Sequence, residues 1–84
     1  MTKRLFVNGL PHHITGEILE TFFLAFGMVE SVTVMIDKIA DRSHRAAFVE
    51  MGSESEAEKA IRNLDGTQVE GRTIKVHVAQ PRLI

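Results

Sequence analysis

The sequence contains no cysteine, tryptophan or tyrosine, and only two of its 84 residues are proline. Without cysteine, the fold can hold neither a disulfide nor a thiolate metal site. No apolar run approaches the roughly 18 residues of a membrane span, and the first residues lack the apolar stretch of a signal peptide. These absences predict a soluble, cytoplasmic domain that packing alone stabilises and that does not contact a membrane.

The sequence also has little net charge, because ten Lys and Arg residues nearly balance eleven Asp and Glu residues. A net charge of −1 excludes a uniformly basic nucleic-acid-binding tail. No serine or threonine is paired with a base in a catalytic pattern, so we expect neither an enzyme nor a cofactor. The adjacent His12 and His13 should diverge, and no Glu or Cys stands at ligand spacing, so we expect no metal site.

Apolar periodicity and turn residues predict six elements in one continuous domain over residues 1–84. Thr15 is expected to cap the first helix, which ends at a left-handed Gly27, and Ser53 with Glu56 forms a capping box for the second helix. Residues 8–11 are expected to form a turn. Strands are expected at 5–7, 29–36, 46–51 and 73–78, and helices at 16–26 and between Ser53 and Asp65.

The order strand, helix, strand, strand, helix, strand is typical of the α+β, ferredoxin-like βαββαβ sandwich. Its four-stranded antiparallel sheet carries both helices on one face, because each helix has one apolar stripe and only one sheet can cover it. The other face of the sheet is left to water.

Alternation along the strands assigns two of the five phenylalanines, Phe6 and Phe48, to this open face. A phenyl ring left exposed loses the roughly 1.5–3 kcal/mol of stabilisation that its burial would give. Two exposed rings on one face therefore suggest a binding partner that covers them. The sheet-forming and terminal segments 1–9, 42–51 and 72–84 carry a balance of +6, and the rest of the chain carries −7. Rings among cations suit single-stranded nucleic acid, whose bases stack on aromatic side chains and whose phosphates bind Lys and Arg.

Two segments resemble the ribonucleoprotein motifs of the RNA recognition motif family. Residues 5–10 (Leu-Phe-Val-Asn-Gly-Leu) are similar to its six-residue motif, and residues 44–51 (His-Arg-Ala-Ala-Phe-Val-Glu-Met) to its eight-residue motif. The resemblance extends over essentially the whole chain and implies that Phe6 and Phe48 stack two bases.

The eight-residue motif departs from the family pattern in its first half. His44 replaces the leading Lys or Arg, Arg45 replaces a glycine, and Ala46 replaces the third-position aromatic. These departures predict weaker binding than in a member with three rings, with Arg45 expected to supply the missing cation. The open face and the resemblance together predict these RNA-binding residues: Arg4, Phe6, Asn8, Met35, His44, Arg45, Phe48, Lys75, His77, Gln80 and Arg82.

We therefore expect a monomeric RNA-binding domain that holds roughly two to four unpaired nucleotides. Single-stranded DNA remains an alternative ligand, because stacking is insensitive to the sugar. The competing hypothesis is a protein-binding or weakly self-associating module. Such a module would use the sheet face or the outer side of the first helix, where Ile18, Leu24, Ala25 and Met28 lie, and Leu83 and Ile84 could fold back over the two rings.

Overall fold

The computed structural model describes residues 3–11, 13–36 and 44–79. The predicted order of helices and strands is confirmed, with one additional small hairpin. The elements are β1 (Arg4–Pro11), α1 (Gly16–Leu24), β2 (Val29–Ile36), β3 (His44–Met51), α2 (Glu54–Leu64), β4 (Gln68–Val69), β5 (Arg72–Thr73) and β6 (Lys75–Val78).

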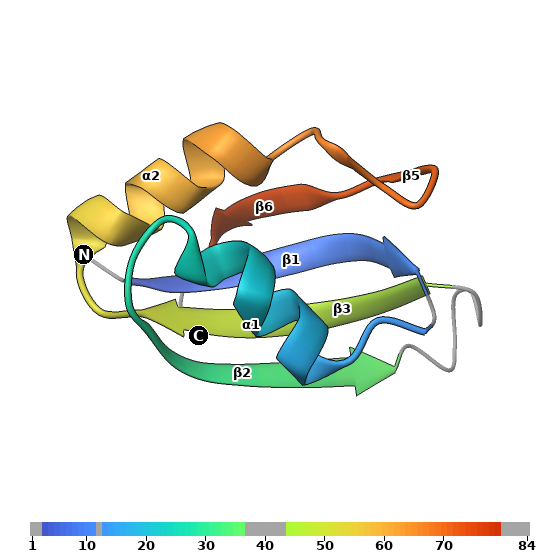
Figure 1. Cartoon of the computed structure of the whole chain (residues 1–84), viewed down its shortest axis with the longest axis horizontal. Coiled ribbons are helices and arrows are strands. Elements are labelled where there is room, and N and C mark those ends of the chain that lie inside the picture. The colour runs from blue at the N-terminus through green and yellow to red at the C-terminus, as the bar shows by residue number, and fades with distance from the viewer. Residues whose placement is uncertain (1–2, 12, 37–43, 80–84) are drawn as a thin grey trace, which may run out of the picture.

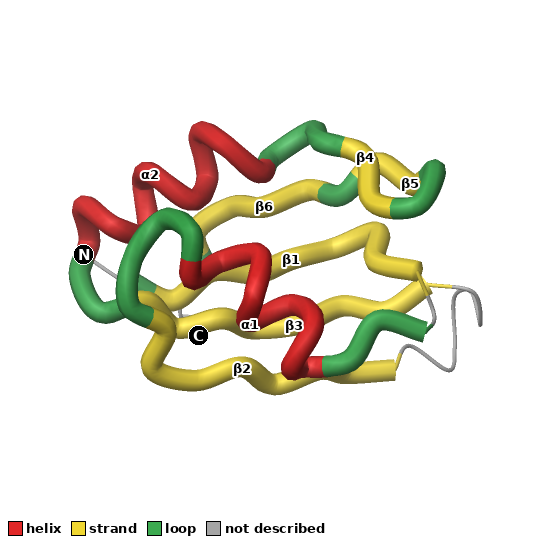
Figure 2. The backbone as a smooth tube through the Cα atoms, in the orientation of Figure 1, coloured by secondary structure: helices red, strands yellow, loops and turns green. Residues whose placement is uncertain are grey.

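The main sheet has four antiparallel strands in the order β2-β3-β1-β6. Both helices pack on the same side of this sheet, because their buried residues belong to one core with the inward residues of the strands. In Figure 1, α1 crosses in front of the strands and α2 lies above β6. The short β4–β5 hairpin lies between the end of α2 and the start of β6 (Figure 2). The α+β, ferredoxin-like fold class is thus confirmed. Within the described residues, no helix has the length and apolar character needed to cross a membrane.

The core lies between the sheet and the two helices. In β1, Leu5 and Val7 are completely buried while Phe6 between them is not, as the period of two along a strand requires. Phe23 of α1 is also completely buried, and the small residues Ala57 and Ala60 of α2 are buried as well. Burying each large apolar side chain contributes roughly 1.5–3 kcal/mol.

Hydroxyl side chains begin both helices, as the sequence predicts. The Thr15 hydroxyl oxygen accepts the backbone N–H of Ile18 at 3.2 Å. The Ser53 hydroxyl oxygen accepts the backbone N–H of Glu56 at 3.3 Å and donates to the Glu56 carboxylate at 3.0 Å. The second carboxylate oxygen of Glu56 accepts the backbone N–H of Met28 at 3.0 Å. Glu56 therefore ties the start of α2 to the segment that leads into β2.

The turn expected at residues 8–11 is instead part of β1. The pairing of β1 with β3 shifts register between Val7 and Leu10. Beyond this shift, Leu10 and Pro11 pair with β3 again. Gly9 makes this bulge with φ +83°, and a Cβ at this position would lie 2.7 Å from the backbone oxygen of Thr73. An Asn-Gly pair favours both turns and bulges, because glycine readily adopts a positive φ. The predicted turn is wrong because the chain forms a bulge here and continues as a strand.

Gly27 is not the left-handed cap that the sequence predicts for the first helix. The helix ends two residues before the expected position, at Leu24, and its C-cap is Ala25 in the right-handed helical region. A Cβ at Gly27 would lie 2.5 Å from the Cγ atom of Glu56. Gly27 thus makes room for the Glu56 side chain, a contact between distant segments that local sequence cannot reveal.

Candidate nucleic-acid interface

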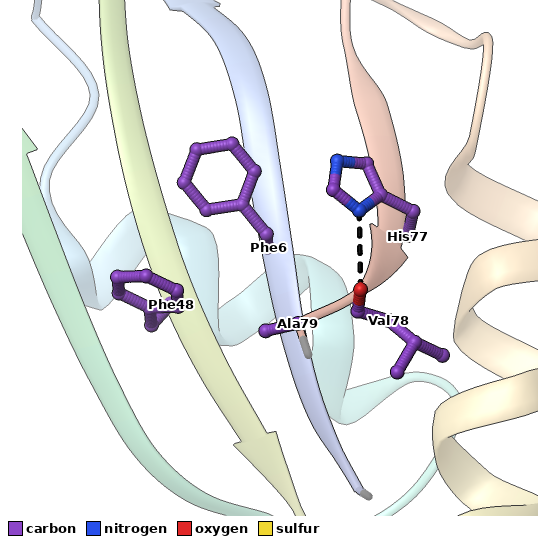
Figure 3. Close-up of a pocket in the computed structure, with 5 residues that line it drawn as sticks. All are labelled: Phe6, Phe48, His77, Val78 and Ala79. Atoms are coloured by element: carbon purple, nitrogen blue, oxygen red, sulfur yellow. Dashed lines mark hydrogen bonds between the residues drawn. The ribbon is translucent and has the colours of Figure 1, made fainter. Parts of the chain in front are cut away.

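Three rings form a row across the open face of the sheet. Phe6 of β1 lies opposite Phe48 of β3 on one side and opposite His77 of β6 on the other. The ring centroids of Phe6 and Phe48 are 5.2 Å apart with a 57° tilt, and those of Phe6 and His77 are 5.4 Å apart with a 46° tilt. Figure 3 shows the three rings on successive strands. Because paired residues share a face, the row follows directly from strand register.

The rings border a shallow hollow that Val78 and Ala79 complete (Figure 3). Phe6 and Phe48 are half-buried and His77 is exposed, so each ring offers surface to a ligand. The structure therefore places both phenylalanines on the face opposite the helices, where alternation predicted them. A contact role for His77 was predicted, but its ring contact with Phe6 was not, because that contact depends on the register between β1 and β6.

Hydrogen bonding orients the imidazole of His77. Its Nδ1 atom lies 3.2 Å from the backbone oxygen of Val78, drawn as the dashed line in Figure 3. Because a carbonyl oxygen can only accept, this contact requires a proton on Nδ1, and the neutral ring then keeps Nε2 as a hydrogen-bond acceptor. A donor group of a base can meet that nitrogen.

Cationic side chains accompany the row. The Arg4 guanidinium carbon lies 4.2 Å from the centroid of the Phe48 ring, within cation–π distance. Arg4 is exposed and lies opposite Glu50 in the register of β1 and β3. At the other end of the face, the exposed Lys75 lies opposite the exposed Asn8. The structure thus brings Arg4, Asn8 and Lys75 to the same face as the rings.

Lys3, which contributes to the positive balance of the sheet side, is engaged by an acidic residue. Its Nζ atom lies 3.0 Å from a carboxylate oxygen of Glu30 in β2. The hydrogen bond with Glu30, and then its negative charge, raise the pKa of Lys3 above the ordinary value of 10.5. This cation is therefore partly neutralised before any phosphate arrives.

Met35 lies one row further along the face, opposite Ala46 in the pairing of β2 with β3. The Met35 side chain is 36% exposed, and Ala46 is half-buried. Ala46 occupies the position at which the family pattern has its third aromatic ring. The structure therefore offers a thioether there, in the place expected for a third nucleotide.

Four of the predicted contact residues have side chains outside the described part of the chain. His44 and Arg45 belong to β3, where their backbones pair with Pro11 and Leu10, but nothing beyond the backbone is described for them. Gln80 and Arg82 lie entirely outside the described residues, as do Leu83 and Ile84, which were expected to be able to cover the rings. Their roles stay predictions.

The tandem histidines are only partly described. His12 lies outside the described residues, and the side chain of the exposed His13 contacts the carboxylate of Glu70 at the tip of the β4–β5 hairpin. Among the described residues, no group of three or more His, Asp or Glu side chains is arranged to hold a metal ion.

The family model of the RNA recognition motif matches residues 5–75. The chain belongs to the RNA recognition motif family. The resemblance inferred from residues 5–10 and 44–51 is thereby confirmed, and so is the prediction of an RNA-binding domain. The match covers the row of rings only in part, because it ends before His77.

Relatives of this RNA recognition motif occur in plants and cyanobacteria. The "33 kDa ribonucleoprotein, chloroplastic" of Nicotiana sylvestris is 47% identical over 74 residues, which are 88% of this chain and 23% of the relative. The "Putative RNA-binding protein RbpB" of Nostoc sp. is 38% identical over 93% of this chain and 76% of the relative. The chain spans about a quarter of the length of the Nicotiana sylvestris relatives it matches.

Solved RNA recognition motif structures superpose closely on the chain. A "Sxl-lethal protein/RNA complex" matches with a TM-score of 0.86 and 33% identity, over 98% of this chain and 49% of the other. The "Structure of Rna15 RRM with bound RNA (GU)" matches with a TM-score of 0.83 and 25% identity, over 100% of this chain and 89% of the other. Both of these structures contain RNA.

The expected cytoplasmic location is contradicted by the relatives. The 33 kDa and 28 kDa ribonucleoproteins of Nicotiana sylvestris and the RNA-binding protein CP33 of Arabidopsis thaliana are all named as chloroplast proteins. The expectation was drawn from composition and from the absence of an apolar leader. Neither property distinguishes one aqueous compartment from another, because the same fold and the same surface suit both.

Proposed function

We propose that residues 1–84 act as one monomeric domain that binds single-stranded RNA across the open face of the sheet and that has no catalytic role. One base stacks on Phe48 and one on Phe6, and the ring of His77 extends the platform to a further nucleotide. The observation that carries this proposal is the row of three rings, with centroids 5.2 and 5.4 Å apart.

Stacking supplies the sequence-tolerant part of the affinity. A base that stacks on an aromatic side chain gains roughly 1–3 kcal/mol whatever its identity. Because Phe6 and Phe48 are half-buried, the surrounding strands already hold both rings in position. Little side-chain entropy is therefore lost when a base arrives.

Phosphate contacts supply the salt-dependent part. Arg4 and Lys75 lie on the same face as the rings, on opposite sides of the row, and Arg45 and Arg82 are further candidates from the sequence. Glu50, opposite Arg4, repels phosphate and directs the RNA backbone away from that position. Nucleic-acid affinity is expected to fall as salt rises, with a slope of roughly 0.7 per neutralised phosphate for single strands.

Titration of the chain with a fluorescein-labelled single-stranded RNA of about eight nucleotides tests the proposal by fluorescence anisotropy. Phe48→Ala should weaken binding about 5–150-fold, which corresponds to the loss of one stacked base. Ile18→Ala, on the exposed outer side of α1, is the matched control and should leave affinity unchanged.

Equal affinities of the wild-type and Phe48→Ala proteins would contradict the proposal. So would RNA-induced amide shifts that lie on the helices and spare β1, β3 and β6. A DNA oligonucleotide of the same sequence, titrated in parallel, measures the contribution of the 2′-hydroxyl groups, since stacking alone does not distinguish the two sugars.

A further inference from the structure

The two edges of the main sheet are protected to very different degrees. At the β6 edge, the backbone N–H of Val76 donates to the Asp65 carboxylate at 2.9 Å, and β6 itself is only four residues long and carries Lys75. These are the means by which proteins prevent another chain from adding to a sheet.

The β2 edge has almost none of this protection. Among the described residues, β2 pairs only with β3, and no backbone hydrogen bond from any of them covers its outer edge. From Ser31 to Ile36 the strand is regular, uncharged and free of proline, and four of these six residues are β-branched. Figure 1 shows β2 at the lower margin of the sheet with no other labelled element beyond it. Such an edge is a template for an additional strand.

The core beside this edge is incompletely covered. The valines of β2 that face the helices are only half-buried, whereas the inward residues of β3 and β1 are completely buried. A groove runs here between α1 and β2. Its lining residues are Gly16, Glu17, Glu20, Val29, Glu30, Ser31 and Val32.

The charge of this groove defines its occupant. Residues 5–37 contain no Lys or Arg, and among the described residues neither Glu17 nor Glu20 forms an ion pair. Lys3 already engages Glu30. The groove therefore presents two carboxylates over an apolar floor of Val29 and Val32. The aliphatic stem of a lysine or arginine can pack on such a floor while its charged end meets the carboxylates.

We propose that an extended, lysine- or arginine-bearing peptide segment of another protein adds to the outer edge of β2 as a fifth strand. An added strand lies about 4.8 Å from β2, and its alternate side chains recur about 7 Å apart on the helix side. The Cβ atoms of Glu17 and Glu20, three residues apart on α1, are about 5–6 Å apart. Basic residues at alternate positions thus match the two carboxylates.

A second copy of this chain fits the edge poorly. Antiparallel pairing of two β2 strands about a twofold axis would place α1 beside the α1 helix of the other copy. Glu17 and Glu20 would then face the same carboxylates, and like charges that meet at an interface oppose association. Charge complementarity therefore favours a basic partner.

The test is a titration of the isotope-labelled chain with the blocked peptide Thr-Lys-Val-Lys-Val-Lys-Thr, followed by amide NMR. We expect saturable binding below about 1 mM, with shifts along residues 31–36 and in the first turn of α1. The same peptide with N-methyl groups at alternate residues keeps its charge but cannot donate its full set of main-chain hydrogen bonds. It should bind at least about tenfold more weakly.

The double variant Glu17→Lys/Glu20→Lys should also weaken binding at least about tenfold, because it replaces attraction with repulsion. Glu58→Lys, at an exposed position of α2, is the matched control and should leave peptide binding unchanged. Urea unfolding of both variants tests whether the fold is retained.

Four outcomes would overturn the proposal. They are equal binding of the N-methylated peptide, shifts confined to the row of rings, the absence of saturable binding, and a concentration-dependent dimer that shifts the β2 amides without any peptide. The last outcome would assign the edge to a second copy.

Discussion

Phe6 and Phe48 lie directly opposite each other on neighbouring antiparallel strands, with ring centroids 5.2 Å apart and ring planes tilted by 57°. Each ring therefore restricts the orientation of the other, in an arrangement favoured by aromatic pairs. A base that stacks on one ring meets a surface that the second ring has helped to fix. The two side chains should behave as a coupled unit in binding.

This coupling is measurable in a double-mutant cycle. Phe6→Ala and Phe48→Ala should each weaken RNA binding, and the double variant should lose less than the sum, with a coupling energy of about 0.5–1.5 kcal/mol. Fluorescence anisotropy on the four proteins at one salt concentration gives the energies. Losses that add within about 0.5 kcal/mol would show that the two rings act independently.

Restoring the missing third ring should strengthen binding. Ala46 lies opposite Met35 on the face that carries the rings, so Ala46→Phe adds a stacking surface there. We expect a gain of about 1–3 kcal/mol, or roughly 5–150-fold in affinity for single-stranded RNA. Ile18→Phe, which adds a ring on the outer side of α1, serves as the control. An unchanged affinity of Ala46→Phe would mean that no nucleotide reaches this row.

Gly9 should tolerate a side chain less well than Gly66, although both have a positive φ. Gly9→Ala imposes the left-handed penalty of about 1–2 kcal/mol and also places Cβ 2.7 Å from the Thr73 backbone oxygen. At Gly66, φ is +81° but a Cβ would meet no atom within 4 Å, so Gly66→Ala should cost only the conformational part. Urea unfolding compares the two. Equal destabilisation by Gly9→Ala and Gly66→Ala would show that the backbone of β5 moves to accommodate a side chain at Gly9 at no cost.

The Lys3–Glu30 contact predicts a pH dependence at the alkaline end. The raised pKa of Lys3 means that the folded state holds this proton more tightly than the unfolded state. The stabilisation is thus present below the ordinary value of 10.5 and is lost as pH rises through the higher folded value. An NMR titration of the Lys3 side chain should show a lower midpoint in Glu30→Gln and no change in Glu58→Gln. If the midpoint in Glu30→Gln equals that of the wild-type protein, Glu30 does not cause the raised pKa of Lys3.

Local sequence was sufficient wherever a structural feature depended on periodicity or on a neighbouring residue. The alternation of Leu5, Phe6 and Val7 assigned each side chain to the correct face, and the hydroxyls of Thr15 and Ser53 marked both helix starts. These features depend on spacing of two to four residues, which the chain carries locally.

Features that depend on pairing between distant segments could not be predicted in this way. The ring contact between Phe6 and His77 requires the register of β1 with β6, and the role of Gly27 requires the position of the Glu56 side chain. Asn8 and Gly9 permit a turn or a bulge equally, and only the continued pairing of β1 with β3 decides between them.

The position of Phe6 between Leu5 and Val7 links ligand binding to the stability of the fold. Three consecutive residues of a central strand supply both the interior of the protein and its ligand-facing surface, with Leu5 and Val7 at 0% exposure. Ligand binding and the stability of the fold are therefore thermodynamically linked, because only the folded sheet presents the Phe6 ring. Heat, denaturant or a cavity beneath β1 will weaken recognition, and a bound oligonucleotide will raise the melting temperature in proportion to the logarithm of its concentration.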